Sequence, residues 1–126
     1  MRLRLLPGEF AVLKRDPGPF PVWLTEASPW FVARTSDELS VMCPVEAVPG
    51  EVVGSASTGY RCLRVDGDLA FDAVGVVAGV SRPLADAGLS LFLVSTHDRD
   101  YVFVSEDDLP AALAAYDAAG FEVVTT

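Results

Sequence analysis

Residues 75–104 read GVVAGVSRPLADAGLSLFLVSTHDRDYVFV, and this stretch decides the fold. Its first half has the apolar spacing of a helix, with a stripe at positions i, i+3, i+7 and i+10 formed by Val77, Val80, Leu84 and Ala87. Gly88 follows, and glycine is a common helix end. The second half has two apolar runs around a polar turn, which is typical of paired strands. The stretch therefore predicts a helix followed by a β-hairpin.

Further elements are predicted on both sides of this stretch. A strand is expected over residues 60–65 before it. After it we expect a helix with an apolar stripe of Leu109, Ala112, Leu113 and Tyr116. Gly120 ends that helix, and residues 121–124 form a last strand. The order strand, helix, strand, strand, helix, strand is that of the ferredoxin-like βαββαβ unit, whose antiparallel sheet has helices on one face.

Part of this pattern occurs twice in the chain. Residues 30–49 align with residues 91–110 without a gap. Every aligned pair differs by the same number of positions, as Thr35 and Thr96 do (96 − 35 = 61). A fixed period of this kind indicates that one supersecondary unit has been duplicated.

The duplication predicts two unequal units. The expected fold is α+β, a tandem ferredoxin-like duplication with a degenerate first unit at residues 1–58 and a complete second unit at residues 59–126. In the first unit the second helix is shortened to residues 45–48. Its other expected elements are a hairpin of residues 2–6 and 10–15, a short helix at 22–27, strands at 30–34 and 39–43, and a short strand near 51–53.

Composition and charge narrow the classes of function. The chain has 126 residues, of which 51% are hydrophobic, so it can bury a core and is not expected to be disordered. Its net charge of −9 repels phosphate backbones, so no nucleic-acid partner is expected. Charged residues, Pro or Gly interrupt every apolar run, and the N-terminus has no secretory signal pattern, so no membrane partner is expected.

The cysteines and the single histidine give no metal motif. Cys43 and Cys62 lie in apolar runs without CxxC spacing, and His97 cannot complete an ordinary zinc set with them. We expect buried, reduced thiols, which suits a cytoplasmic protein. Neither a metal nor a cofactor is expected.

Two further segments carry a resemblance to a known family, together with residues 75–104. These are LRLLPGEFAVLK at residues 3–14 and TSDELSVMCP at residues 35–44. With them the chain resembles the ACT-domain family, in the small tandem form related to the CASTOR arginine sensors. The resemblance implies a regulatory fold that binds an amino acid or a similar small molecule at the seam between two ACT units, without catalysis. His97 and Arg99 depart from the aromatic residue and the threonine usual there, which leaves the ligand open.

The start of the first predicted helix is one candidate binding site, formed by Val74, Gly75, Val76 and Val77. Free N–H groups at a helix start suit a carboxylate, and glycine lets a ligand approach the backbone. The alternative is an ordinary strand-to-helix turn. The resemblance gives the two interpretations equal weight.

The two equivalent turns of the repeat are the other candidates. They contain Thr35, Ser36, Asp37 and Glu38 in the first unit and Ser95, Thr96, His97, Asp98 and Asp100 in the second. Their hydroxyl and carboxylate groups could hold an ammonium group or a cationic side chain. The alternatives are residues that only form the turn, or local pairing of Asp98, Arg99 and Asp100.

An enzymatic role has little support in the sequence. His97 beside Asp98 could act as a base in a small hydrolase or isomerase, but no GxSxG, P-loop, HExxH or GxGxxG motif is present. We therefore expect no enzyme. The large aromatic residues are interpreted as core, with the walls of a ligand slot as the alternative: Trp23, Trp30, Phe31 and Phe92.

The last predicted hairpin is apolar on both faces. Leu91 and Leu93 point one way, and Phe92 and Val94 the other. The face away from the helices needs a cover, either the first unit or another subunit, so a homodimer is expected. The predicted function is a regulatory module that binds a small ligand, with an amino acid favoured. The alternative is a protein-interaction or dimerisation module with a vestigial pocket.

Overall fold

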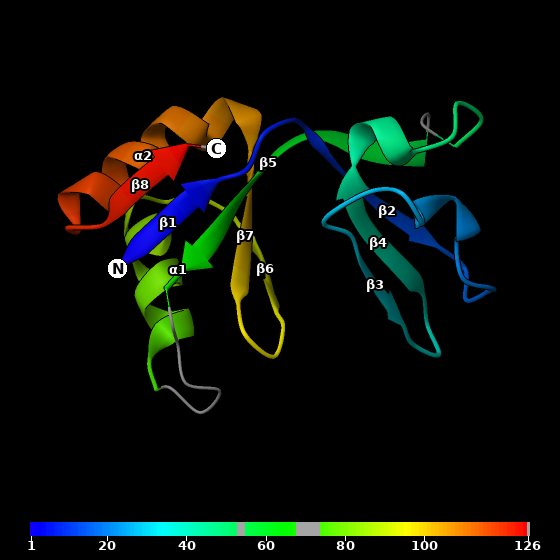
Figure 1. The fold of residues 1–126 in the computed structure, drawn as a ribbon, viewed down its shortest axis with the longest axis horizontal. Coiled ribbons are helices and arrows are strands. Elements are labelled where there is room, and N and C mark those ends of the chain that lie inside the picture. The colour runs from blue at the N-terminus through cyan, green and yellow to red at the C-terminus, as the bar shows by residue number, and fades with distance from the viewer. Residues whose placement is uncertain (53–54, 68–73, 126) are drawn as a thin grey trace. The chain divides into compact units, whose positions relative to one another are not determined.

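The computed structural model describes residues 1–126 except 53–54, 68–73 and 126 (Figure 1). The chain divides into two compact units, each described here by itself. The larger unit comprises residues 1–7 and 61–126, and the smaller unit comprises residues 8–60. The expected division placed the boundary between residues 58 and 59 and assigned the N-terminal strand to the first unit. In the structure, residues 1–7 belong instead with the second half of the chain.

The larger unit has the predicted order of elements after its N-terminal strand. From residue 61 onward it reads strand, helix, strand, strand, helix, strand. Its elements are β1 (Arg2–Leu5), the second half of β5 (Ala56–Asp66), α1 (Val76–Asp86), β6 (Phe92–Ser95), β7 (Asp100–Ser105), the 3-10 turn η4 (Glu106–Asp108), α2 (Leu109–Ala118) and β8 (Glu122–Thr125).

The position of β1 corrects one prediction. The strand order of the larger unit is β6-β7-β5-β1-β8, with β1 antiparallel to β5 and parallel to β8. Residues 2–6 therefore do not form a hairpin with residues 10–15. The backbone N–H of Leu6 donates to Cys62 O at 2.9 Å, which extends the pairing with β5. This pairing places Leu3 and Leu5 in the core of the larger unit. A hairpin with residues 10–15 would not place them there.

The core of the larger unit lies on one face of its sheet. Alternate strand residues point to it, and both helices cover it with their apolar stripes. Tyr116 of α2 is fully buried, and its Oη donates to the backbone O of Val80 in α1 at 2.7 Å. Core residues are Leu3, Leu5, Leu63, Val65, Val80, Leu84, Val102, Val104, Leu109, Ala112 and Tyr116.

The smaller unit has the ferredoxin-like strand order β3-β4-β2-β5. Its elements are β2 (Phe10–Arg15), the 3-10 turn η1 (Val22–Leu24), β3 (Phe31–Arg34), β4 (Leu39–Pro44), the 3-10 turn η2 (Val45–Ala47) and the first half of β5. The two strands predicted at 30–34 and 39–43 are confirmed. The short strand near 51–53 is wrong: residues 51 and 52 lie in a turn, and residue 53 lies outside the described residues.

The repeat found in the sequence recurs in the structure. β3 and β6, β4 and β7, and η2 and η4 begin 61 residues apart (92 − 31, 100 − 39 and 106 − 45). After η4 the chain continues as α2, whereas after η2 no α-helix follows in the described residues before β5. The reason is local: the Ala- and Leu-rich residues 109–118 favour a helix, whereas residues 48–57 carry glycines and valines that disfavour one.

Candidate functional site

The start of α1 is open to solvent. Gly75 precedes the helix with φ of 83°, a left-handed conformation that glycine adopts without strain. A side chain built there would meet nothing within 4 Å. Val74 is 98% exposed and Val77 is largely exposed. Among the described residues no side chain caps the helix, and the first-turn backbone N–H groups of a helix are the ones suited to binding an anion.

The two threonines of the repeated turns form hydrogen bonds to the backbone of their own turns. Thr96 Oγ1 accepts a hydrogen bond from the backbone N–H of Arg99 at 3.1 Å, and the backbone N–H of Thr96 donates to Arg99 O at 2.8 Å. Thr35 Oγ1 accepts from the backbone N–H groups of Asp37 and Glu38, both at 3.1 Å. The turn-forming interpretation is therefore confirmed for both threonines. Their role in ligand binding stays a prediction.

Asp100 is a buried carboxylate at the end of the β6–β7 hairpin. It is 8% exposed and faces Ser95 across the ladder, where Ser95 Oγ donates to its Oδ1 at 2.5 Å. Asp100 alternates with Val102 and Val104, whose side chains lie in the core beneath the helices. The Ser95–Asp100 pair therefore lies on the helix-covered side of the sheet.

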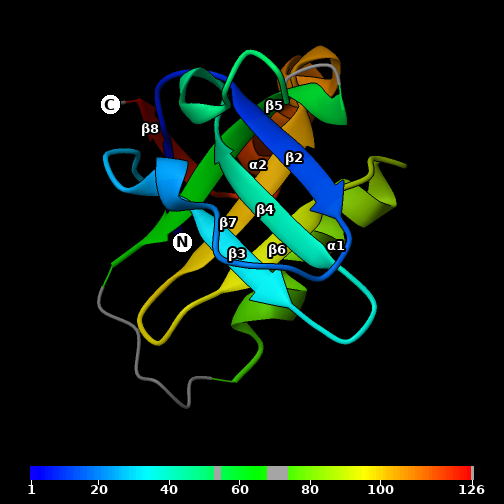
Figure 2. The same cartoon turned by 90° about the vertical axis from the view of Figure 1, so that its right-hand side faces the viewer.

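The remaining residues of this turn bear on the alternative of local pairing. Among the ion pairs of the described residues, none joins Asp98, Arg99 and Asp100 to one another. Instead the guanidinium of Arg99 donates to the backbone O of Gly67, just beyond β5, and His97 Nδ1 lies 2.7 Å from Asp98 Oδ1 on the exposed tip. Arg99 thus ties the β6–β7 turn to the segment that leads toward α1. Both views place this turn and the start of α1 at the same end of the larger unit (Figures 1 and 2).

The sheet face away from the helices carries charge as well as apolar groups. Asp66 accepts hydrogen bonds from Arg64 Nε at 2.7 Å and from Arg4 Nε at 2.8 Å. The bond from Arg64, supported by Arg4, lowers the pKa of Asp66 even though burial opposes this. Phe92 remains 42% exposed, so its assignment to the core is wrong.

The cysteines are buried and free, as predicted. Burial raises the pKa of the Cys62 thiol to about 12 and that of Cys43 to about 11, with Glu46 adding to the effect at Cys43. Both thiols are therefore protonated and unreactive at neutral pH. Within the described ranges, no group of three or more His, Cys, Asp or Glu side chains is placed to hold a metal ion. No helix in that part of the chain is long and apolar enough to cross a membrane.

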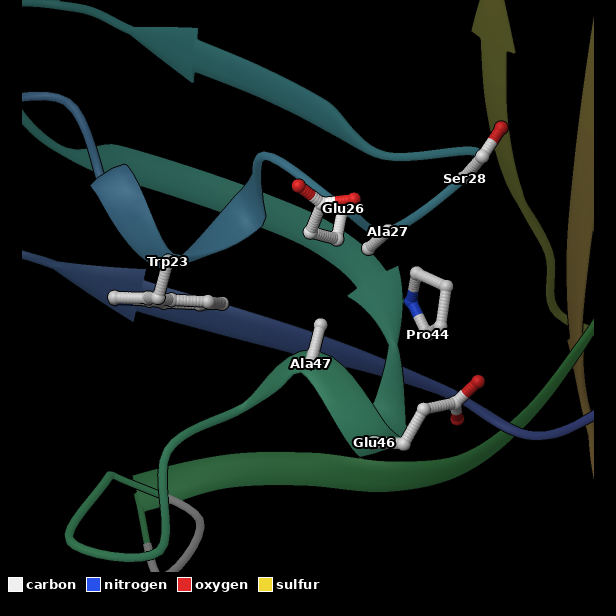
Figure 3. Close-up of a pocket in the computed structure, with 7 residues that line it drawn as sticks. All are labelled: Trp23, Glu26, Ala27, Ser28, Pro44, Glu46 and Ala47. Atoms are coloured by element: carbon white, nitrogen blue, oxygen red, sulfur yellow. The ribbon is translucent and has the colours of Figure 1, made fainter.

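A pocket in the smaller unit was missed by the sequence analysis. It has a volume of about 550 Å³ and lies between the η1 segment and the end of β4 with η2 (Figure 3). Its lining residues are Trp23, Glu26, Ala27, Ser28, Pro44, Glu46 and Ala47. Of these residues, only Trp23 was considered from the sequence, where the wall of a ligand slot was the alternative to a core position.

Comparison with protein families gives a match over about half of the chain. Residues 55–115 match the family model described as the ACT domain. The chain contains an ACT domain. The match begins at β5 and ends within α2, and the ferredoxin-like ACT fold predicted from the sequence is confirmed.

About half of this chain is similar to curated proteins that are named as arginine sensors. The human protein "Cytosolic arginine sensor for mTORC1 subunit 1" is 34% identical over 68 residues, which cover 52% of this chain and 21% of the human protein. The bovine protein of the same name matches equally well. The alignment thus spans only about a fifth of these relatives' length.

Solved structures extend the likeness to the whole chain. Protein Atu0741 from Agobacterium tumefaciens has a TM-score of 0.87 at 28% identity, covering 99% of this chain and 92% of that one. The regulatory subunit of aspartate kinase from Thermus thermophilus has a TM-score of 0.61 at 13% identity, covering 88% of this chain and 91% of that one. At that identity the second comparison shows the fold alone.

Proposed function

We propose that the chain is a non-catalytic regulatory module that binds an amino acid through its ACT domain. The ligand carboxylate would meet the backbone at Gly75, Val76 and Val77, beside Val74. Its ammonium group or cationic side chain would meet the β6–β7 turn, where Ser95, Thr96, Asp98 and Asp100 offer oxygen atoms. The buried carboxylate of Asp100 carries the proposal, because an ionised group with little exposure is best stabilised by an opposite charge.

The relatives suggest which amino acid to test first. The matched curated proteins are named arginine sensors, and a guanidinium group can bind a carboxylate through two parallel hydrogen bonds. Arginine is therefore the first candidate. Thr35, Ser36 and Glu38 of the smaller unit stay predictions from the sequence. We further propose a cytoplasmic homodimer, in which the amino-acid site would lie at a seam between subunits.

A thermal-shift screen with each of the twenty amino acids tests the proposal. A ligand that binds only the folded state must stabilise it, so arginine at a concentration 100-fold above its Kd should add about 2.7 kcal/mol to the free energy of unfolding. Asp100→Asn should abolish the shift. Asp107→Asn, which removes the same charge from an exposed position in η4, should leave it unchanged.

The contrary result is equally clear. If no amino acid at millimolar concentration raises Tm, the sensor proposal fails. If the shift survives Asp100→Asn and Asp98→Ala together, the ligand binds elsewhere on the chain.

The exposed aromatic ring of Phe92 supports a second candidate, a protein-interaction or dimerisation module. Phe92 lies on β6, and Phe103 is its ladder partner on β7. Light scattering on the wild type and on Phe92→Ser separates the two candidates. A dimer that dissociates in the variant, without any amino-acid response in the wild type, would favour the interaction module.

A further inference from the structure

The pocket of the smaller unit has two distinct walls (Figure 3). One wall is the η1 segment, which contributes Trp23 and Glu26. The other is the end of β4 with η2, which contributes Pro44, Glu46 and Ala47. Its volume of about 550 Å³ lies within the usual range for small-molecule sites.

The charge around this pocket has one sign. Glu26 and Glu46 are its ionisable lining residues, and both side chains are exposed. Among the described residues, neither carboxylate forms an ion pair with a basic side chain. Both carboxylates therefore contribute negative potential beside the cavity, and the net charge of −9 adds to it.

The aromatic residue of the pocket adds a second means of recognising a cation. Trp23 is half-buried and packs against the core of the smaller unit, so its indole is held in place. An indole face attracts guanidinium and ammonium groups more strongly than other aromatic rings do. Carboxylates on both walls of the pocket can accept hydrogen bonds from such a group.

We propose that this pocket binds a small organic cation that has a guanidinium or ammonium group and no carboxylate. The cation would contact the indole of Trp23 and be neutralised by Glu26 and Glu46. This site differs from the proposed amino-acid site, which requires a carboxylate on the ligand. It also involves only residues of the smaller unit.

Isothermal titration with agmatine tests the proposal, because agmatine has a guanidinium and an ammonium group but no carboxylate. Binding should weaken at least about tenfold in Glu26→Gln/Glu46→Gln and again in Trp23→Leu. The control Glu51→Gln/Glu106→Gln removes the same charge from exposed positions outside the pocket and should bind within about twofold of the wild type.

Three results would overturn the proposal. The first is no agmatine binding at millimolar concentration to the wild type at low salt. The second is an equal loss of binding in the control double variant, which would indicate nonspecific attraction to the acidic surface. Agmatine binding that is abolished by Asp100→Asn but not by the pocket variants would also contradict it, and would leave the amino-acid proposal intact.

Discussion

Ser95 Oγ lies 2.5 Å from Asp100 Oδ1, and the two residues are direct partners in the β6–β7 ladder. In the part of the chain that the structure describes, Ser95 is the side chain that donates to this buried carboxylate. One hydroxyl cannot satisfy the acceptors of two carboxylate oxygens. Asp100 therefore retains the capacity to bind a cation.

Removing this hydroxyl should destabilise the larger unit. Ser95→Ala leaves a buried acceptor without its donor, and we expect the free energy of unfolding to fall by about 1–3 kcal/mol. Urea denaturation measures the change. Ser95→Thr keeps a hydroxyl and serves as the control. Equal stability of Ser95→Ala and the wild type would show that the bond contributes nothing.

Two glycines near the start of α1 should respond in opposite directions to alanine. Gly75→Ala forces a non-glycine residue to φ of 83°, so we expect a loss of about 1–2 kcal/mol. Gly79 lies within the helix, where a Cβ would meet only Met1 Cε at 3.7 Å, so Gly79→Ala should gain about 0.5–1 kcal/mol. Thermal unfolding of both variants checks the prediction. The same sign of effect in both would contradict it.

Acid should weaken the larger unit through Asp66. Hydrogen bonds from Arg64 and then Arg4 lower the pKa of Asp66 in the folded state below its ordinary value of 3.8. This contribution is therefore fully present above pH 3.8 and is lost as the pH falls through the folded pKa. We expect Asp66→Asn to cost about 1–2 kcal/mol at pH 7, because both arginines are about one-third exposed and screened by water.

Urea denaturation of the wild type and Asp66→Asn between pH 7 and pH 2 measures this contribution. The difference in stability between them should shrink toward low pH. A difference that is constant over this range would show that Asp66 gains nothing from its ionised form.

Alkali should weaken the larger unit through Tyr116. Burial raises the pKa of Tyr116 from 10.0 to about 12, so its contribution is fully present below pH 10 and is lost as the pH rises through 12. Tyr116→Phe should cost about 1 kcal/mol at pH 7, since it removes the hydrogen bond to Val80 O. Above pH 10 the variant should lose less stability than the wild type. Chemical denaturation at several pH values compares the two, and parallel curves would refute the assignment to Tyr116.

The predictable part of the fold is the part encoded locally. The turn around Thr96 and the helical stripe through Val80 are local patterns, and the structure contains both. The offset of 61 residues is visible because each copy of the repeat carries its own local pattern. The predicted partner of β1 was wrong, because the alternation of Leu3 and Leu5 is compatible both with a local hairpin and with pairing to a distant strand.

The missed features of the sites depend on distant contacts. Arg99 reaches Gly67 across 32 positions, and Trp23 shares a pocket with Glu46 of another element. No periodicity in the sequence brings such residues together. The approach of these elements is set by the packing of the sheet and its helices, which determines where side chains meet.

The central claim is that the ACT domain binds an amino acid at the start of α1 and the β6–β7 turn. Amide NMR spectra of the ¹⁵N-labelled protein, titrated with arginine and with the other amino acids that raise Tm, test it most directly. The account predicts saturable shifts concentrated at Gly75–Val77 and Thr96–Asp100, and their loss in Asp100→Asn. An absence of saturable shifts with every amino acid, or shifts confined to other residues, would contradict it.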